Sequence, residues 1–143
     1  MHLFYSNITK NLKQYNPHRL YSLNIFTASP GSVVGKLYEQ KCKKVVSETF
    51  NVPVALVGGA NDGGIDLKWS KTLGCGTTVN FIGQCKYRDG KRIQPDVVRG
   101  LEGSLSAHTP KTVGVLLTNR RPSVESLKRL INSVYPMMYL KVK

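Results

Sequence analysis

The chain has 143 residues, 41% of them hydrophobic, which is typical of one globular domain with its own core. No stretch approaches the roughly 20 consecutive apolar residues that a transmembrane helix needs, so membrane insertion is not expected. A total of 21 Lys and Arg against 8 Asp and Glu gives a net charge of +13. This excess predicts a polyanionic partner, and the absence of a basic amphipathic helix favours nucleic acid over an anionic membrane.

The N-terminal segment differs in composition from the rest of the chain. Residues 1–38 contain no acidic side chain and are rich in Ser, Asn, Tyr and Leu, as organelle transit peptides are, although they hold a single Arg. A flexible basic arm or a structured extension would have the same composition. Pro30 and Gly31 mark the boundary. We therefore expect a basic extension over residues 1–30, which is either a mitochondrial transit segment or one of these alternatives, and a folded domain over 31–143.

The three cysteines, Cys42, Cys75 and Cys85, are an odd number and form no CxxC pair. This usage predicts reduced thiols and no structural zinc site. Cys42 and Cys85 are expected to be small core residues.

Hydrophobic periodicity predicts an alternation of helices and strands. In chain order the predicted elements are a helix over 32–50 with Ser32 as its N-cap, a short apolar run over 54–57, strands over 65–69 and 77–87 joined by a turn over 73–76, a helix that begins at Pro95, a buried strand over 113–118, a helix over 123–134 and a final strand over 137–142. The second helix is expected to bury Val97, Val98, Leu101 and Leu105, and the third carries the apolar stripe Val124, Leu127, Leu130, Ile131 and Val134. The two strands joined by the short turn should form an antiparallel hairpin. The order predicts an α/β fold, a mixed sheet with helices on its faces.

Acidic residues are scarce, so their positions are informative. Asp62 and Asp66 lie four positions apart in a glycine-rich stretch, and Asp66 is predicted at the start of a strand. On the following strand, Gln84 and Lys86 project from the same face because strand side chains alternate. If the two strands are hairpin neighbours, Asp66 faces Gln84 and Lys86 across the pair.

An acid, an amide and an ammonium group at one point suit the cleavage of phosphodiester bonds. Carboxylate and amide oxygens are ligands for a hard cation such as Mg²⁺ or Mn²⁺, which stabilises developing charge and lowers the pKa of a bound water. Lys86 can orient or deprotonate the attacking water, or neutralise the phosphate. The alternative is structural: Asp66 as a turn acid or the partner of Lys86 in a salt bridge, and Gln84 as an ordinary strand residue.

These residues also resemble a known family. The motifs are Gly35-x-x-Tyr38-Glu39, Asp62-Gly63-Gly64-Ile65-Asp66, Gln84-x-Lys86, Ile93-x-Pro95-x-Val97-Val98-Arg99 and Gly114-Val115-Leu116-Leu117-Thr118-Asn119. Their order resembles the Mrr-like endonucleases of the PD-(D/E)xK superfamily, in the variant where Gln replaces the second acid. Within that group the chain is most similar to the fungal mitochondrial "required for respiratory growth protein 7" family.

The resemblance implies a restriction-endonuclease-like three-layer core and a mitochondrial location. It also implies roles for four residues: Asp66 as the metal-binding acid, Gln84 as the second metal ligand, Lys86 as the catalytic lysine and Glu39 as a supporting acid from the first helix.

Basic residues follow the predicted catalytic strand and the buried strand. With Lys86, they are Arg88, Lys91, Arg92, Arg120 and Arg121. They are candidates for binding phosphates of DNA, and a solvated basic face is the alternative.

The sequence thus predicts a Mg²⁺-dependent DNA endonuclease that acts in mitochondrial DNA maintenance. Cutting of both strands by a protein with one site would imply a homodimer. Two alternatives stay open: a catalytically inactive DNA-binding module on a nuclease fold, and a basic component of a mitochondrial ribonucleoprotein.

Overall fold

A single five-stranded sheet forms the centre of the molecule in the computed structural model, which describes residues 30–58 and 63–143. Its strands are β1 (Ala55–Leu56), β2 (Leu67–Thr72), β3 (Thr78–Lys86), β4 (Thr112–Thr118) and β5 (Met137–Lys141), and they lie side by side in that order. β2 is antiparallel to both β1 and β3, whereas β4 and β5 run parallel to β3. The predicted hairpin and the mixed sheet are therefore confirmed.

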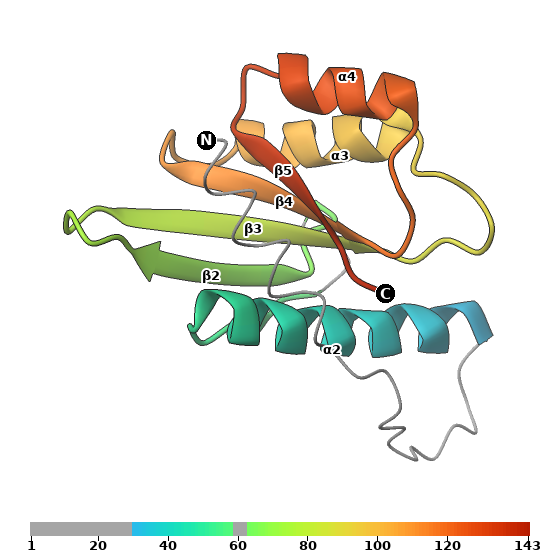
Figure 1. The fold of residues 1–143 in the computed structure, drawn as a ribbon, viewed down its shortest axis with the longest axis horizontal. Helices are drawn as coiled ribbons and strands as arrows, with labels where there is room; N and C mark the ends of the chain where they lie inside the picture. Colours follow the sequence, from blue (N-terminus) through green and yellow to red (C-terminus); the bar gives the residue numbers. More distant parts are fainter. Residues whose placement is uncertain (1–29, 59–62) are drawn as a thin grey trace.

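Helices cover both faces of the sheet (Figure 1). Helix α2 (Pro30–Phe50) lies across one face, and helices α3 (Pro95–Ser106) and α4 (Val124–Asn132) lie on the other. This arrangement is the three-layer α/β fold that the sequence predicted. The predicted extension over residues 1–30 lies outside the described residues, apart from the backbone of Pro30.

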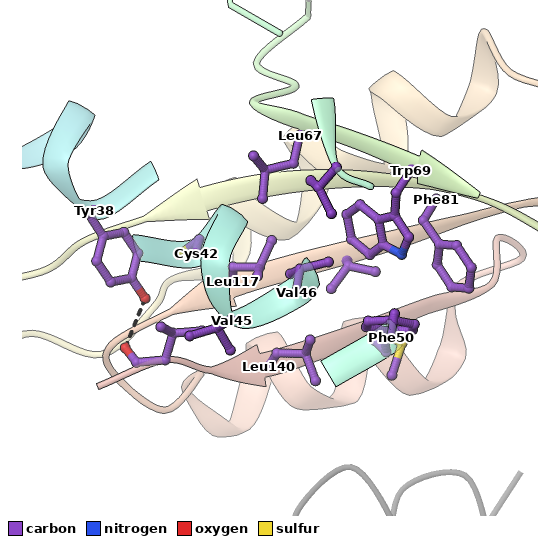
Figure 2. Packing of buried hydrophobic residues seen from close by; sticks show 14 residues of the cluster. Tyr38, Cys42, Val45, Val46, Phe50, Leu67, Trp69, Phe81, Leu117 and Leu140 are labelled. Carbon is purple, nitrogen blue, oxygen red and sulfur yellow. Dashed lines mark hydrogen bonds between the residues drawn. The ribbon is translucent and has the colours of Figure 1, made fainter. Parts of the chain in front are cut away.

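The larger core lies between α2 and the sheet. Phe50 at the end of α2 packs against Trp69 of β2 and Phe81 of β3, whose rings are stacked at 5.2 Å (Figure 2). Near the middle of α2, the Tyr38 hydroxyl donates a hydrogen bond of 3.0 Å to the carbonyl of Val142. Cys42, one turn further along the helix, is fully buried, as the sequence predicted.

The second core lies between the sheet and α3. The apolar side chains of α3 that were predicted to be inside, Val97, Val98, Leu101 and Leu105, are all buried. Ile82 and Leu116 meet this helix from the sheet. Gly114 of β4 allows the close approach, because a Cβ atom there would lie 2.6 Å from a methyl group of Leu105.

Three local predictions were wrong. The first helix begins at Pro30, so Ser32 lies inside it and is not its N-cap. The second strand begins at Leu67 and not at residue 65. Ile65 and Leu67 are buried in different cores, on opposite sides of the sheet. Residues two positions apart in a regular strand share a face, and Ile65 and Leu67 do not, so the chain must turn at Asp66.

The third error concerns α4. Ser123 caps this helix by accepting a hydrogen bond of 3.1 Å from the amide of Ser126, and Leu130 is buried. Val124, Ile131 and Val134 are exposed, although the sequence placed them on an apolar stripe with Leu130. The reason is geometric, since α4 is an outer helix that contacts α3 and β5 along only part of its surface. Across residues 30–58 and 63–143, none of the helices is both long and apolar enough to span a bilayer.

Candidate functional site at the carboxyl edge of the sheet

The sheet topology brings the predicted site residues to one edge. β3, β4 and β5 are parallel, so their carboxyl ends lie at the same edge of the sheet. β2 runs the other way and begins at that edge, directly after Asp66. β2 pairs Leu67 with Gly83, and the amide of Asp66 also bonds the carbonyl of Gly83, so Asp66 lies beside the end of β3 that carries Gln84 and Cys85.

Asp66 is held firmly by backbone and side-chain hydrogen bonds. Its amide donates to the carbonyl of Gly83 at 2.8 Å, and its carbonyl accepts from the amide of Val57 at 2.9 Å. Its carboxylate oxygen Oδ2 accepts from the amide of Cys85 at 2.7 Å. This bond orients the carboxylate at the end of β3.

Gln84 has an unusual environment for a polar side chain. Its Oε1 atom is buried and has no hydrogen-bond donor among the described residues. Its Nε2 atom lies 3.0 Å from the point where a Cβ of Gly64 would be. Gly64 has φ +79°, so a larger residue there would be strained and would also press on the Gln84 amide.

The glycine-rich turn beside Gln84 is fixed to α3. The Ser104 hydroxyl lies 2.6 Å from the carbonyl oxygen of Gly63 and 3.1 Å from that of Gly100, and these two acceptors share its one proton. The turn, α3 and β3 therefore surround the Gln84 amide. Asp62, which belongs to the same motif, lies outside the described residues.

Lys86 lies two residues beyond Gln84 on the same face of β3. Its neighbour across the ladder is Thr118 of β4, which is fully buried. The lysine itself is half-buried. Two strand residues span about 7 Å, so its flexible side chain reaches a group bound near Asp66 and Gln84.

Glu39 belongs to α2, on the face of the sheet opposite to Gln84 and Lys86, and its negative charge acts on the Cys85 thiol. A hydrogen bond with the Cys42 thiol, burial, and the nearby negative charges of Asp66 and Glu39 raise the pKa of Cys85 well above its usual range. Cys85 is therefore a neutral thiol between α2 and β3 and adds no charge to the site.

The donor set fits a hard cation only in part. Residues 30–58 and 63–143 hold no group of three His, Cys, Asp or Glu side chains that could bind a metal ion. Asp66 and the unpartnered amide oxygen of Gln84 supply two oxygen donors on neighbouring strands. Mg²⁺ usually keeps several waters and takes one or two protein oxygens, and these two donors fit that requirement.

Two contacts join the loops that carry the basic residues. We call Lys86, Arg88, Lys91, Arg92, Arg120 and Arg121 the basic patch. Asn119 accepts from the amide of Arg88 at 2.8 Å and donates to its carbonyl at 2.9 Å. Further along, Ile93 forms a parallel bridge with Pro122. The hydroxyl of Thr118 bonds both the amide and the carbonyl of Arg120, each at 3.1 Å.

Apart from Lys86 at the end of β3, the basic patch therefore lies on two loops that contact each other. Lys91, Arg92, Arg120 and Arg121 are exposed, and Arg88 is half-buried. The catalytic, metal-binding and nucleic-acid-binding roles of the site residues stay predictions.

Two structural residues of the site were missed by sequence reasoning. Asn119 was noted only as part of a family motif, and Ser104 was not singled out. Both use their side chains to bind backbone groups of a distant segment, and such a contact has no local signature in the sequence.

A cleft of about 520 Å³ lies between α3 and α4, by the amino end of β5 and away from this edge. The residues that line it include Glu102, Arg129 and Tyr135.

Comparisons with known proteins agree with this fold. The chain is similar to the MspJI restriction endonuclease, solved in complex with a 27-mer oligonucleotide, with a TM-score of 0.59, 18% identity and coverage of 86% of this chain and 33% of the nuclease chain. At that identity the likeness shows the fold alone.

A second comparison concerns sequence. The chain is 30% identical over 136 residues to "Uncharacterized protein C824.03c, mitochondrial" of Schizosaccharomyces pombe, which covers 92% of this chain and 53% of the relative. The chain thus spans about half the length of that relative.

The family model described as "Required for respiratory growth protein 7" matches residues 70–143, which is just over half of the chain. This match and the name of the S. pombe relative confirm the mitochondrial location predicted from the sequence. The matched region begins within β2 and includes β3, with Gln84 and Lys86, and everything that follows. The chain therefore belongs to the required for respiratory growth protein 7 family.

Proposed function

We propose that the protein is a Mg²⁺-dependent endonuclease that hydrolyses phosphodiester bonds of DNA in mitochondria and so serves respiratory growth. The observation that carries the proposal is the buried Oε1 of Gln84, which has no partner among the described residues and belongs to the residue next to Cys85, whose amide orients the Asp66 carboxylate. Buried polar atoms without a partner are rare, and functional sites are a common reason for them.

Each residue of the site has a chemical task in this proposal. Asp66 and Gln84 hold the cation, and when bound it supplies positive charge for the reacting phosphate and acidifies water. Lys86 donates hydrogen bonds to a phosphate oxygen or to the attacking water. Hydrolysis joins the water oxygen to phosphorus and breaks one P–O bond to the sugar, whose oxygen takes up a proton.

Glu39 is a supporting acid in the same proposal. Its carboxylate approaches from α2, and the Cys85 thiol, whose pKa both Asp66 and Glu39 raise, lies close to the two acids. The basic patch binds the phosphates on either side of the cleaved bond. Neighbouring elements fix its two loops before any substrate arrives, which reduces the ordering cost of binding.

A nicking assay tests the proposal. Purified protein is incubated with supercoiled circular DNA and Mg²⁺, and Lys86→Ala is compared with Lys111→Ala, the same change at the amino end of β4, on the opposite edge. General acid–base groups contribute about a hundred- to ten-thousand-fold, so Lys86→Ala should lose at least that lower factor while Lys111→Ala keeps wild-type activity. Equal nicking by the wild type and Lys86→Ala would rule out catalysis by this site.

A second function is favoured by one specific observation. The described residues offer one carboxylate and one neutral amide on the paired strands, and no cluster of three acidic, His or Cys ligands. A fold of this kind can keep DNA binding without cleavage. That alternative predicts salt-sensitive binding with no nicking in Mg²⁺ or Mn²⁺, and nicking with either ion eliminates it.

A further inference from the structure

Lys141, at the end of β5, lies in the same row of the sheet as Lys86. β3 pairs Lys86 with Thr118, and β4 pairs Thr118 with Lys141. Residues that pair across a sheet share a face, so both lysines lie on the face that α3 and α4 cover. The row two residues further into the sheet has the same orientation and contains Gln84, Leu116 and Tyr139. Leu116 and Tyr139 both belong to the core on that side.

The two lysines are separated by one strand. Neighbouring strands lie about 4.8 Å apart, so their backbones are about 10 Å from one another. Thr118 between them is fully buried and its hydroxyl bonds the backbone of Arg120. The chain therefore leaves the sheet after Thr118, and Arg120 follows there, between the strands that carry Lys86 and Lys141.

The chain around Lys141 is rigidly held. The amide of Val142 donates to the carbonyl of Thr118 at 2.9 Å, and its carbonyl accepts from the buried hydroxyl of Tyr38 at 3.0 Å. The last residue of β5 is thus fixed to β4 on one side and followed by a residue tied to α2. Lys141 itself is half-buried, with its backbone in the ladder.

Among the residues that the structure describes, Lys141 forms no ion pair, unlike Lys44, which pairs with Glu48, and Arg129, which pairs with Glu102. A half-buried ammonium group at the edge of a sheet, next to a basic patch, is a strong attractor for an anion.

We infer that Lys141 is a phosphate-binding residue that extends the site across the sheet, so that one nucleic-acid strand lies over the carboxyl ends of β3, β4 and β5. The inference rests on the proposed function in assigning a nucleic acid to this edge. Lys86 contacts the phosphate that is cleaved, and Lys141 contacts another phosphate of the same strand, beyond Arg120.

The test measures binding of a labelled DNA duplex in the absence of divalent ions, so that cleavage plays no part. Each phosphate contact contributes about 0.9 to the slope of log K against log salt concentration. Lys141→Gln should lower that slope by about 0.9 and weaken binding about eightfold at 0.1 M salt, because one contact scales as salt concentration to that power. Lys141→Arg should keep the wild-type slope.

The matched control is Lys111→Gln, which removes the same charge from an exposed site at the other edge of the sheet. It should leave the slope unchanged. If Lys141→Gln and Lys111→Gln behave alike, the role of Lys141 is wrong and the proposed function is untouched. If Lys141→Gln weakens binding but the wild type never nicks DNA, the phosphate contact stands and the catalytic proposal fails. A wild type that binds no duplex overturns both.

Discussion

The side chain of Gln84 combines burial with an acceptor atom that no donor satisfies. A buried polar atom without a hydrogen bond costs about 1–3 kcal/mol of stability. At an ordinary core position, an apolar residue would avoid that cost. Here the amide is surrounded by Gly64, Gly100 and the backbone of β3, which leave no protein donor for Oε1 among the described residues. A cation or a water at this point removes the cost.

A carboxylate in place of this amide should make the cation a condition of stability. Gln84→Glu keeps the shape of the side chain and adds a buried negative charge next to Cys85, whose amide binds the Asp66 carboxylate. In EDTA the variant should melt below the wild type, because a buried carboxylate beside another acid is disfavoured. Mg²⁺ should raise the Tm of the variant more than that of the wild type. An ion present at a hundred times its Kd adds about 2.7 kcal/mol to the free energy of unfolding of the protein that binds it.

The measurement is a thermal melt with and without Mg²⁺, and Gln40→Glu on the exposed surface of α2 is the control. The control should melt at nearly the same temperature in both buffers. If the Tm of Gln84→Glu is also the same with and without Mg²⁺, no cation binds at this point.

The proximity of Asp66, Gln84 and Lys86 could be predicted in part from the sequence. Strand alternation and the hairpin were enough to bring Gln84 and Lys86 to one face and Asp66 close to them. The bond between Asp66 and the amide of Cys85 could not be predicted, because it depends on the turn of the chain between Ile65 and Leu67. That turn follows from the two cores on opposite sides of the sheet, which are tertiary features.

Among the elements, α3 was predicted most closely. Pro95 fixes its start and its apolar residues repeat at helical spacing toward a buried face. The same rule failed for α4, where Ile131 is 79% exposed. Periodicity identifies an apolar stripe but does not say how much of the stripe a neighbouring element covers.

After the carboxyl end of β3, a side chain makes the backbone hydrogen bonds that a neighbouring strand would otherwise make. β4 leaves the sheet after Thr118, yet the Asn119 amide makes the two hydrogen bonds to Arg88 that another ladder residue would make. Asn119 thereby keeps the segment after Lys86 in line with β3. A side-chain amide matches a peptide group in its one donor and one acceptor used here.

Asn119→Ala should therefore loosen this end of the strand. We expect a loss of about 1–2 kcal/mol of stability from two bonds to partly buried backbone groups, and faster hydrogen exchange at the Arg88 amide than at amides of the core. Asn80→Ala, the same change at an exposed position near the amino end of β3, should cost no more than about 0.5 kcal/mol. Equal protection of Arg88 in both variants would contradict the role given to Asn119.

At the scale of the whole molecule, charge and topology point to the same edge. The net charge of +13 is spread over the sequence, but the parallel arrangement of β3, β4 and β5 gathers Lys86, Arg120 and Lys141 at their carboxyl ends. The count of basic residues predicted a polyanionic partner. Their common edge required the strand order, which the sequence alone left undetermined.

Family membership and fold set the wider frame. The chain belongs to a family named for a requirement in respiratory growth, and its fold is similar to that of a restriction endonuclease solved with an oligonucleotide. Neither fact identifies a reaction. The chemistry rests on whether Asp66 and Gln84 hold an ion within reach of Lys86.

The most direct test is a crystal of the protein soaked with Mn²⁺ and measured for anomalous scattering. The account predicts one peak between the Asp66 carboxylate and Gln84 Oε1, at a bonding distance near the roughly 2.0–2.1 Å that Mg²⁺ takes from oxygen, and loss of that peak in Gln84→Leu. A crystal with no anomalous density between these two side chains, or one in which the peak persists unchanged without the amide, would contradict it.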